Sequence, residues 1–284
     1  MKKLLFISLL FCFTNLLISQ NTTKKVYTLV GEKTEFDSGL LYLFAELITT
    51  SDGAITIEGQ GAKYEGNLTD FSILTSSEYG FKKKSIFIKY IKERTNIVGE
   101  MMGNAMKFSD SSSLEGKTVE LKKDNSEWKI RNDSIYNNLE LSEIQESMSF
   151  IKAGSLPETM EIDFPQRMKL QDTLALNKDS MIAFFNSNAY EAVEGNLVFK
   201  EVIERNNESI ALFDIDIYIY ASIERQDEAY ITIRMSGIIE RSLKSYSNIK
   251  MELEGMLKME GKLDEEQYLI MEAPAKLTLK KEKL

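Results

Sequence analysis

The sequence contains no histidine, and its one cysteine, Cys12, lies in an apolar run near the N-terminus. Without histidine the chain cannot form a Ser-His-Asp triad, a Cys-His pair or the usual histidine ligand sets of zinc and haem. It also lacks the side chain best suited to proton transfer near neutral pH. Neither a GxxxxGK[ST] loop nor a GxGxxG fingerprint is present. We therefore expect a protein that is not an enzyme and that uses no cofactor and no metal.

The first twenty residues have the pattern of a secretory signal peptide. A Lys-Lys pair precedes the apolar run Leu4–Leu17, and cleavage is expected near Ser19 or Gln20. The run is too short for a membrane-spanning helix, and no later stretch is long and apolar enough for one. A bacterial lipoprotein carries a small residue before its cysteine, but Phe11 stands there, so lipid anchoring is not expected. The prediction is an exported protein, periplasmic or extracellular, of a Gram-negative type of envelope.

The chain is acidic, with 35 lysines and arginines against 44 aspartates and glutamates. Loss of the two signal-peptide lysines leaves 33 basic residues against 44 acidic ones, a net charge of −11. Nucleic acid requires a basic face, so it is excluded as a partner. Loose electrostatic attachment to anionic lipid is disfavoured for the same reason.

The stretch from Glu194 to Gly261 alternates between apolar and polar residues. In Asp214–Ala221 the odd-numbered residues are apolar and the even-numbered ones polar or amphipathic, and the same pattern returns in Ile231–Glu240 and Ile249–Glu260. Successive side chains of a strand point to opposite faces, so each run predicts a strand with one buried and one wet face. A buried parallel strand would be apolar throughout, which favours an antiparallel meander of four long strands. Glycines within it are the expected bend points: Gly195, Gly237, Gly255 and Gly261.

The predicted fold class is mainly β, a β-rich α+β fold built on a large curved antiparallel sheet or half-barrel meander with two or three helices. Leucine and phenylalanine spacing predicts a helix over Leu40–Ile48. A second helix is predicted from a capping box at Ser142–Gln145, with Ile144 on its apolar face. Thr118–Lys122 and Trp128–Arg131 are expected to form a hairpin.

The C-terminal region predicts two more strands, Gln267–Ala273 and Lys276–Leu279, with Pro274 between them at an edge or a break. The expected organisation is a signal peptide over residues 1–20, an N-terminal β-rich half over 21–155 and a C-terminal meander over 156–284. The alternative is one continuous domain over 21–284.

Two stretches resemble uncharacterised exported bacterial β-domain families. Leu114–Leu121 is similar to their Gly-Lys-x-Val-x-Leu strand. In these families a proline-containing segment then leads into a later strand, and Leu156-Pro157 precedes Gln171–Leu174 in a similar way. The predicted opening helix with Gly53–Gly66 also resembles, loosely, the start of periplasmic lipoprotein-carrier half-barrels. These resemblances imply a curved antiparallel sheet with helices in its concave face and carry over no catalytic residues.

The long one-sided strands suggest an apolar concavity for a lipid or another lipophilic small molecule. Thirteen methionines support this hypothesis, because flexible thioethers fill irregular space. The candidate ligand-binding residues are those on the apolar faces of the meander: Ile215, Ile217, Ile219, Ile231, Ile233, Met235, Ile249, Met251, Leu253 and Met259. Ordinary core filling also explains these positions and is the plainer interpretation.

Two alternative functions remain open. The first is a structural or protein-interaction module of the cell envelope. The second is a carboxylate-based glycan hydrolase, for which Asp214 and Asp216 are the candidate acid pair because they share one strand face. Two solvated acids on a polar face explain that pair as well.

Overall fold

The computed structural model describes residues 25–31, 39–59, 61–82, 85–124, 127–149, 162–178, 190–222, 229–262 and 266–283. The predicted signal peptide lies outside these residues. The elements in chain order are β1 (Val26–Thr28), β2 (Gly39–Thr49), β3 (Gly53–Gly59), β4 (Ala62–Lys82), β5 (Ser85–Met101), β6 (Asn104–Ser111), β7 (Thr118–Asp124), β8 (Glu127–Ile130), the 3-10 helix η1 (Asp133–Ile135), α2 (Asn138–Ser149), β9 (Arg167–Lys169), β10 (Thr173–Asn177), β11 (Tyr190–Arg205), β12 (Glu208–Ser222), β13 (Ala229–Ser242), β14 (Asn248–Lys262) and β15 (Gln267–Lys283).

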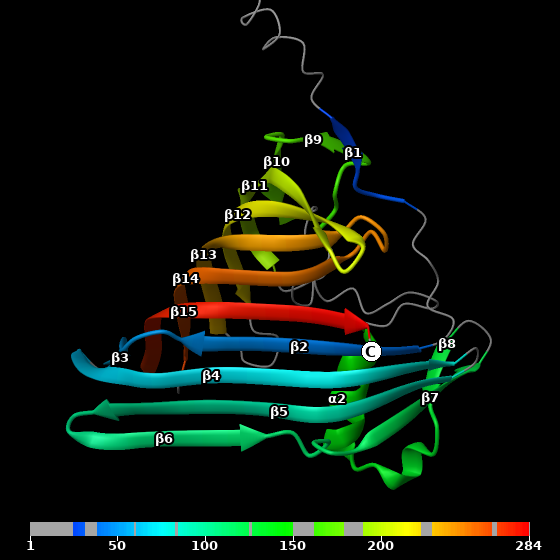
Figure 1. Cartoon of the computed structure of the whole chain (residues 1–284). Coiled ribbons are helices and arrows are strands. Elements are labelled where there is room, and N and C mark those ends of the chain that lie inside the picture. The colour runs from blue at the N-terminus through cyan, green and yellow to red at the C-terminus, as the bar shows by residue number, and fades with distance from the viewer. Residues whose placement is uncertain are drawn as a thin grey trace, which may run out of the picture.

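One antiparallel sheet of 13 strands dominates the molecule, in the order β10-β11-β12-β13-β14-β15-β2-β4-β5-β7-β8 (Figure 1). β3 pairs with β15 and β4, and β6 pairs with β5. The C-terminal strand β15 therefore lies at the centre, where it joins the strands of the two sequence halves. A small two-stranded sheet of β1 and β9 lies beside the β10 end. The predicted fold class, a β-rich curved antiparallel sheet, is confirmed.

The predicted meander corresponds to β11–β14, whose strands contain 16, 15, 14 and 15 residues. On β12 the burial follows the alternation, with Ile215, Ile217 and Ile219 buried and Asp214 and Asp216 exposed. We call the face that carries Ile215 the inner face of the sheet, and the face that carries Asp214 the outer face. The prediction of one buried apolar face and one solvent-exposed polar face is confirmed for this strand.

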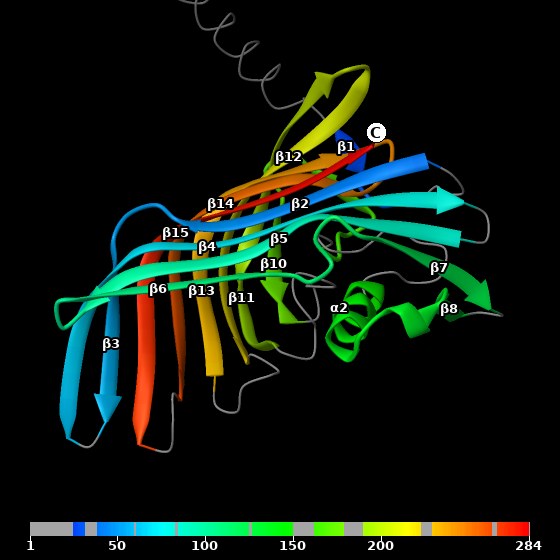
Figure 2. The same ribbon diagram turned by 90° about the horizontal axis from the view of Figure 1, so that it is seen from below.

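The long strands bend part-way along, so that the sheet is folded rather than flat (Figure 2). Three of the predicted bend glycines, Gly195, Gly237 and Gly255, lie where neighbouring backbones come close. A Cβ on Gly237 would lie 2.0 Å from the carbonyl oxygen of Glu252, and a Cβ on Gly255 would lie 2.1 Å from that of Arg234. Only glycine fits such an approach, so these positions allow the sheet to curve.

Pro274 lies within a single strand, β15, and not between two strands as predicted. Its neighbour on one side is interrupted: β15 pairs with β3 up to Glu272 and with β2 from Ala275 onward. The N–H of Thr50, in the connection between β2 and β3, donates to the carbonyl of Pro274 at 2.9 Å. The proline therefore faces the break in the adjacent strand, where its missing N–H removes no ladder bond.

The predicted helix over Leu40–Ile48 is wrong, because these residues form strand β2. β2 pairs with β15 on one side and with β4 on the other, so it is a central strand. Leu41 and Leu47 are buried on the inner face. Apart from Glu46, the intervening residues are apolar or aromatic too, which hides the two-residue period and produces a helix-like spacing.

The second predicted helix exists as α2 but begins earlier than expected. The amide of Glu140 donates to the Asn137 side chain at 3.0 Å, and the Asn137 amide donates to the Glu140 carboxylate at 2.8 Å. This reciprocal pair is a capping box built on Asn137, whereas Ser142 lies inside the helix. Ile144 is fully buried, as predicted.

The inner face holds two apolar clusters. The larger one lines β11–β15, and the smaller one joins Leu41, Ile88 and Val119 to Ile144 of α2. Near the β10 end a row of rings closes the larger cluster. Phe199 stacks on Phe213 at 4.9 Å between ring centroids, and Phe164 lies 5.0 Å from Phe213. The described part of the inner face is thus packed by the protein's own side chains.

Candidate functional site

The predicted ligand-binding residues lie in or against the larger apolar cluster. Those that are buried, each exposing 2% of its surface or less, are Ile215, Ile217, Ile219, Ile233, Met235, Met251 and Leu253. Ile231 and Met259 are partly buried and pack against them. Ile249 is half-buried and lies at a bulge between β13 and β14. In the structure these residues form part of the packed core. Lipid binding by them stays a prediction, and it would require the core to open.

One gap on the inner face lies next to these residues. Its volume is about 10 Å³, and its lining consists of Leu68, Phe71, Leu257, Met259, Met271 and Ala273. Such a space holds about one water molecule, whereas small-molecule pockets measure roughly 300–1,000 Å³. As it stands, this gap has no room for an acyl chain.

A much larger hollow opens on the outer face of β11–β13. Its volume is about 440 Å³, and its lining consists of Asn196, Val198, Asp214, Ile215, Asp216, Ser236 and Gly237. Strand register explains the arrangement, because Asp216 is directly opposite Asn196 of β11 and Ser236 of β13. An amide, a carboxylate and a hydroxyl thus stand side by side on three adjacent strands, all exposed. This row is the polar centre of the hollow.

Sequence reasoning found Asp214 and Asp216 but missed their companions. Asn196 and Ser236 lie far from them in the chain and are brought there only by the register of β11 and β13. The alternation placed Ser236 on the wet face without indicating which residue it would face. No signal short of the pairing register identifies the row.

Charges around the hollow are largely balanced. Lys200 forms an ion pair with Asp214 at 2.9 Å, and Lys276 forms one with Glu254 at 3.1 Å. Arg234 is exposed on the outer face, opposite Tyr218. The hollow is therefore polar without a large excess of either sign.

A group of tyrosines continues the outer face beyond the hollow. Tyr218 and Tyr220 follow Asp216 at two-residue steps on β12, and the rings of Tyr220 and Tyr230 stack at 5.2 Å. Burial raises the pKa of the Tyr220 hydroxyl, and Tyr230 raises it further. The Tyr220 hydroxyl is consequently a neutral donor and acceptor over the whole physiological pH range. The half-buried rings provide flat apolar surface beside a polar row.

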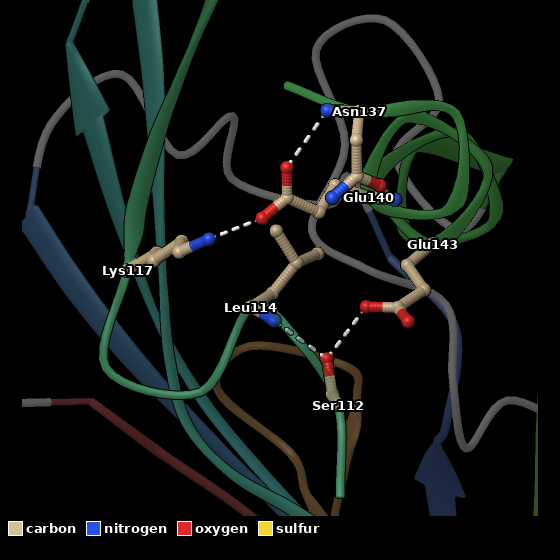
Figure 3. Close-up of polar contacts among 6 residues, drawn as sticks. All are labelled: Ser112, Leu114, Lys117, Asn137, Glu140 and Glu143. Atoms are coloured by element: carbon tan, nitrogen blue, oxygen red, sulfur yellow. Dashed lines mark hydrogen bonds and ion pairs between the residues drawn. The ribbon is translucent and has the colours of Figure 1, made fainter. Parts of the chain in front are cut away.

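Another polar cluster joins α2 to the β6–β7 connection (Figure 3). Lys117 forms an ion pair with the buried carboxylate of Glu140, and Ser112 donates to Glu143 at 2.6 Å. The hydrogen bond from Lys117 lowers the pKa of Glu140, and the Asn137 amide lowers it further. Every group in this cluster has a partner within the protein, so we assign it to holding the helix on the sheet.

Among the described residues, no group of three or more histidine, cysteine, aspartate or glutamate side chains is arranged to hold a metal ion. No helix in the described ranges has the length and apolarity to cross a membrane.

No protein-family model matches the chain, and no curated protein matches it. Among solved structures, the outer membrane protein OprG from Pseudomonas aeruginosa has 8% identity and a TM-score of 0.20, over 87% of this chain and 96% of that chain. The botulinum neurotoxin serotype C1 binding domain has 9% identity and a TM-score of 0.16, over 90% of this chain and 82% of that chain. TM-scores this low carry no argument about fold or function. The comparisons do not support the resemblance to lipoprotein-carrier half-barrels.

Proposed function

We propose that the protein is a non-catalytic, exported envelope protein that binds its ligand on the outer face of β11–β13. The observation that carries this proposal is the 440 Å³ hollow, with its row of Asn196, Asp216 and Ser236. Its volume falls within the range of small-molecule sites, and its polar side chains are exposed in one row across three strands. Export is supported by the signal-peptide pattern of the first twenty residues.

The carboxylate pair in the hollow favours binding over hydrolysis. A glycosidase places its two carboxyl groups on either side of the bond that it cleaves. Asp214 and Asp216 project from the same face of one strand, and Asp214 is ion-paired with Lys200. The hollow is also open to solvent and does not enclose the two acids. The hydrolase alternative therefore receives no support from this arrangement.

Lipid binding on the inner face remains a second candidate, favoured by one observation. Two of the side chains that line the small gap are methionines, Met259 and Met271, which lie opposite each other on β14 and β15. Methionine adapts its shape more readily than branched residues do, so this is where the core would open most easily. Native mass spectrometry of the purified protein after lipid extraction tests the idea. A co-purifying lipid, lost in a Met259→Ile and Met271→Ile double variant, would support it, and a protein without bound lipid would contradict it.

The outer-face proposal is tested by residue-resolved titration. Amide NMR spectra of the purified protein are recorded against neutral oligosaccharides, unstructured peptides of either charge, and phospholipid vesicles. We expect at least one class to shift the amides of Asn196, Asp216 and Ser236. Absence of any shift there, with all classes at high concentration, would overturn the proposal. Shifts confined to the inner face would favour the lipid candidate instead.

A further inference from the structure

The geometry points to a neutral glycan chain as the ligand of the outer-face hollow. This inference rests on the proposed function and names the ligand class. Sugars are amphipathic, with hydroxyl groups around the ring edge and C–H groups on the ring faces. A site that fits them combines several polar groups with flat or branched apolar surface, and the outer face of β11–β13 provides both.

The polar part is the row of three side chains across the sheet. The Asp216 carboxylate accepts hydrogen bonds only, the Asn196 amide both donates and accepts, and the Ser236 hydroxyl does either. Adjacent strands lie about 4.8 Å apart, so the row spans about 10 Å. A sugar ring with hydroxyls on opposite edges can reach all three groups at once.

Apolar surface flanks this row on both sides. Val198 lines the hollow on one side, and Ile238, directly opposite Asp214, is 48% exposed beside it. Tyr218 lies on the other side, one two-residue step along β12 from Asp216. A ring with its edge on the polar row therefore has C–H groups close to valine, isoleucine and tyrosine.

Charge argues for a neutral ligand. No cationic side chain lines the hollow, which disfavours phosphate and other anions. A cationic ligand could contact Asp216. Asp214, however, already forms an ion pair with Lys200, and the positively charged Arg234 of β13 lies directly opposite Tyr218. Basic peptides are consequently disfavoured as well.

The tyrosines indicate a chain longer than a single sugar. Positions i and i+2 on a strand are about 6.8 Å apart, so Tyr220 lies about 14 Å from Asp216 along β12. The stacked pair of Tyr220 and Tyr230 extends the apolar surface in the same direction. An oligosaccharide bound in the hollow would continue over these rings, and affinity should rise with chain length.

The test uses linear neutral oligosaccharides of glucose, mannose and N-acetylglucosamine, each from monosaccharide to hexasaccharide, measured by calorimetry and amide NMR. We expect at least one series to bind with an affinity that rises with length. Asp216→Asn should weaken binding about tenfold, since a charged acceptor is replaced by a neutral amide. Tyr218→Ala should weaken it several-fold.

Matched controls lie elsewhere on the protein. Asp110→Asn on β6 and Tyr64→Ala on β4 change exposed residues of the same types away from the hollow and should leave affinity unchanged. Thermal melts establish that every variant is folded. If peptides or vesicles shift the hollow and no sugar does, the glycan inference fails while the proposed function stands. If nothing shifts the hollow, both fail, and binding unaffected by either hollow variant would also overturn the inference.

Discussion

The guanidinium of Arg241 lies over the ring of Phe164, with its central carbon 4.3 Å from the ring centroid. Arg241 exposes only 2% of its surface, and it donates to the carbonyls of Leu29 and Tyr246 and to the side chain of Asn248. A single side chain thus ties the N-terminal segment around β1 to the turn between β13 and β14. Fold stability should depend strongly on this contact.

Replacing Arg241 with methionine keeps much of its apolar volume but removes the hydrogen bonds that it donates to Leu29, Tyr246 and Asn248. We expect the variant to lose about 3–5 kcal/mol of unfolding free energy, the usual cost of breaking a buried charged network. Urea denaturation measures the loss. Arg234→Met, on the same strand but exposed, is the control and should change stability by about 0.5 kcal/mol or less. Equal losses in the two variants would contradict the anchoring role.

Gly237→Ala and Gly255→Ala should each destabilise the protein by about 2 kcal/mol or more, because the new methyl group would collide with a backbone carbonyl. Gly80→Ala is the control: its Cβ would lie 3.4 Å from the flexible end of Leu40, an ordinary contact. Replacing a strand glycine without strain is neutral or mildly stabilising. Thermal unfolding of the three variants distinguishes the cases, and tolerance of alanine at positions 237 and 255 would show that the bend does not need glycine.

The ion pair of Lys117 and Glu140 predicts a specific pH dependence. The folded-state pKa of Glu140 lies below its usual value, so the pair stabilises the fold fully above the unfolded pKa of about 4.3. This contribution is lost as the pH falls through the lowered folded-state pKa. Glu140→Gln should therefore be less stable than the parent at pH 7, and the difference should shrink in strong acid.

Chemical denaturation from neutral pH down to the acid limit of folding gives the two stability curves. Lys117→Met serves as the control, because without the lysine the Glu140-dependent part of the pH profile should largely disappear. A gap between parent and Glu140→Gln that stays constant down to the lowest pH would refute the assignment.

The capping box on Asn137 separates the observed start of α2 from the start expected at Ser142. Asn137→Ala should cost about 1 kcal/mol, since it removes the acceptor for the Glu140 amide. Gln145→Ala, at the residue that would have completed the alternative capping box, lies on an exposed helical position and should cost about 0.5 kcal/mol or less. Urea denaturation measures both. A larger loss at Gln145 than at Asn137 would reverse the assignment.

Strand alternation was enough to predict β11–β14, because residues such as Asp214 and Ile215 differ sharply in polarity and the sheet has one wet face there. It failed at Leu40–Ile48, where a central strand is apolar on both faces and the two-residue period disappears. Local capping chemistry was also ambiguous, since Asn137–Glu140 and Ser142–Gln145 both match the pattern of a helix start.

The candidate site was only half visible in the sequence for a different reason. Asp214 and Asp216 stand on one strand, so their shared face follows from spacing alone. Asn196 and Ser236 join them only through the register of three strands, which depends on the bulge between Phe199 and Glu201 and on the turns between strands. Inner-face residues such as Ile233 fitted a pocket as well as a core, and the packed structure places them in the core.

The central position of β15 has a consequence for how the chain acquires its structure. β15 follows every other described strand of the sheet in the sequence, yet it lies between β14 on one side and β2 and β3 on the other. Until β15 is in place, the folding chain has two incomplete sheets, with β14 at the edge of one and β2 and β3 at the edge of the other. The backbone groups along these edges lack a neighbouring strand. Such edges invite pairing with other chains, so aggregation during folding should be greatest before β15 is in place.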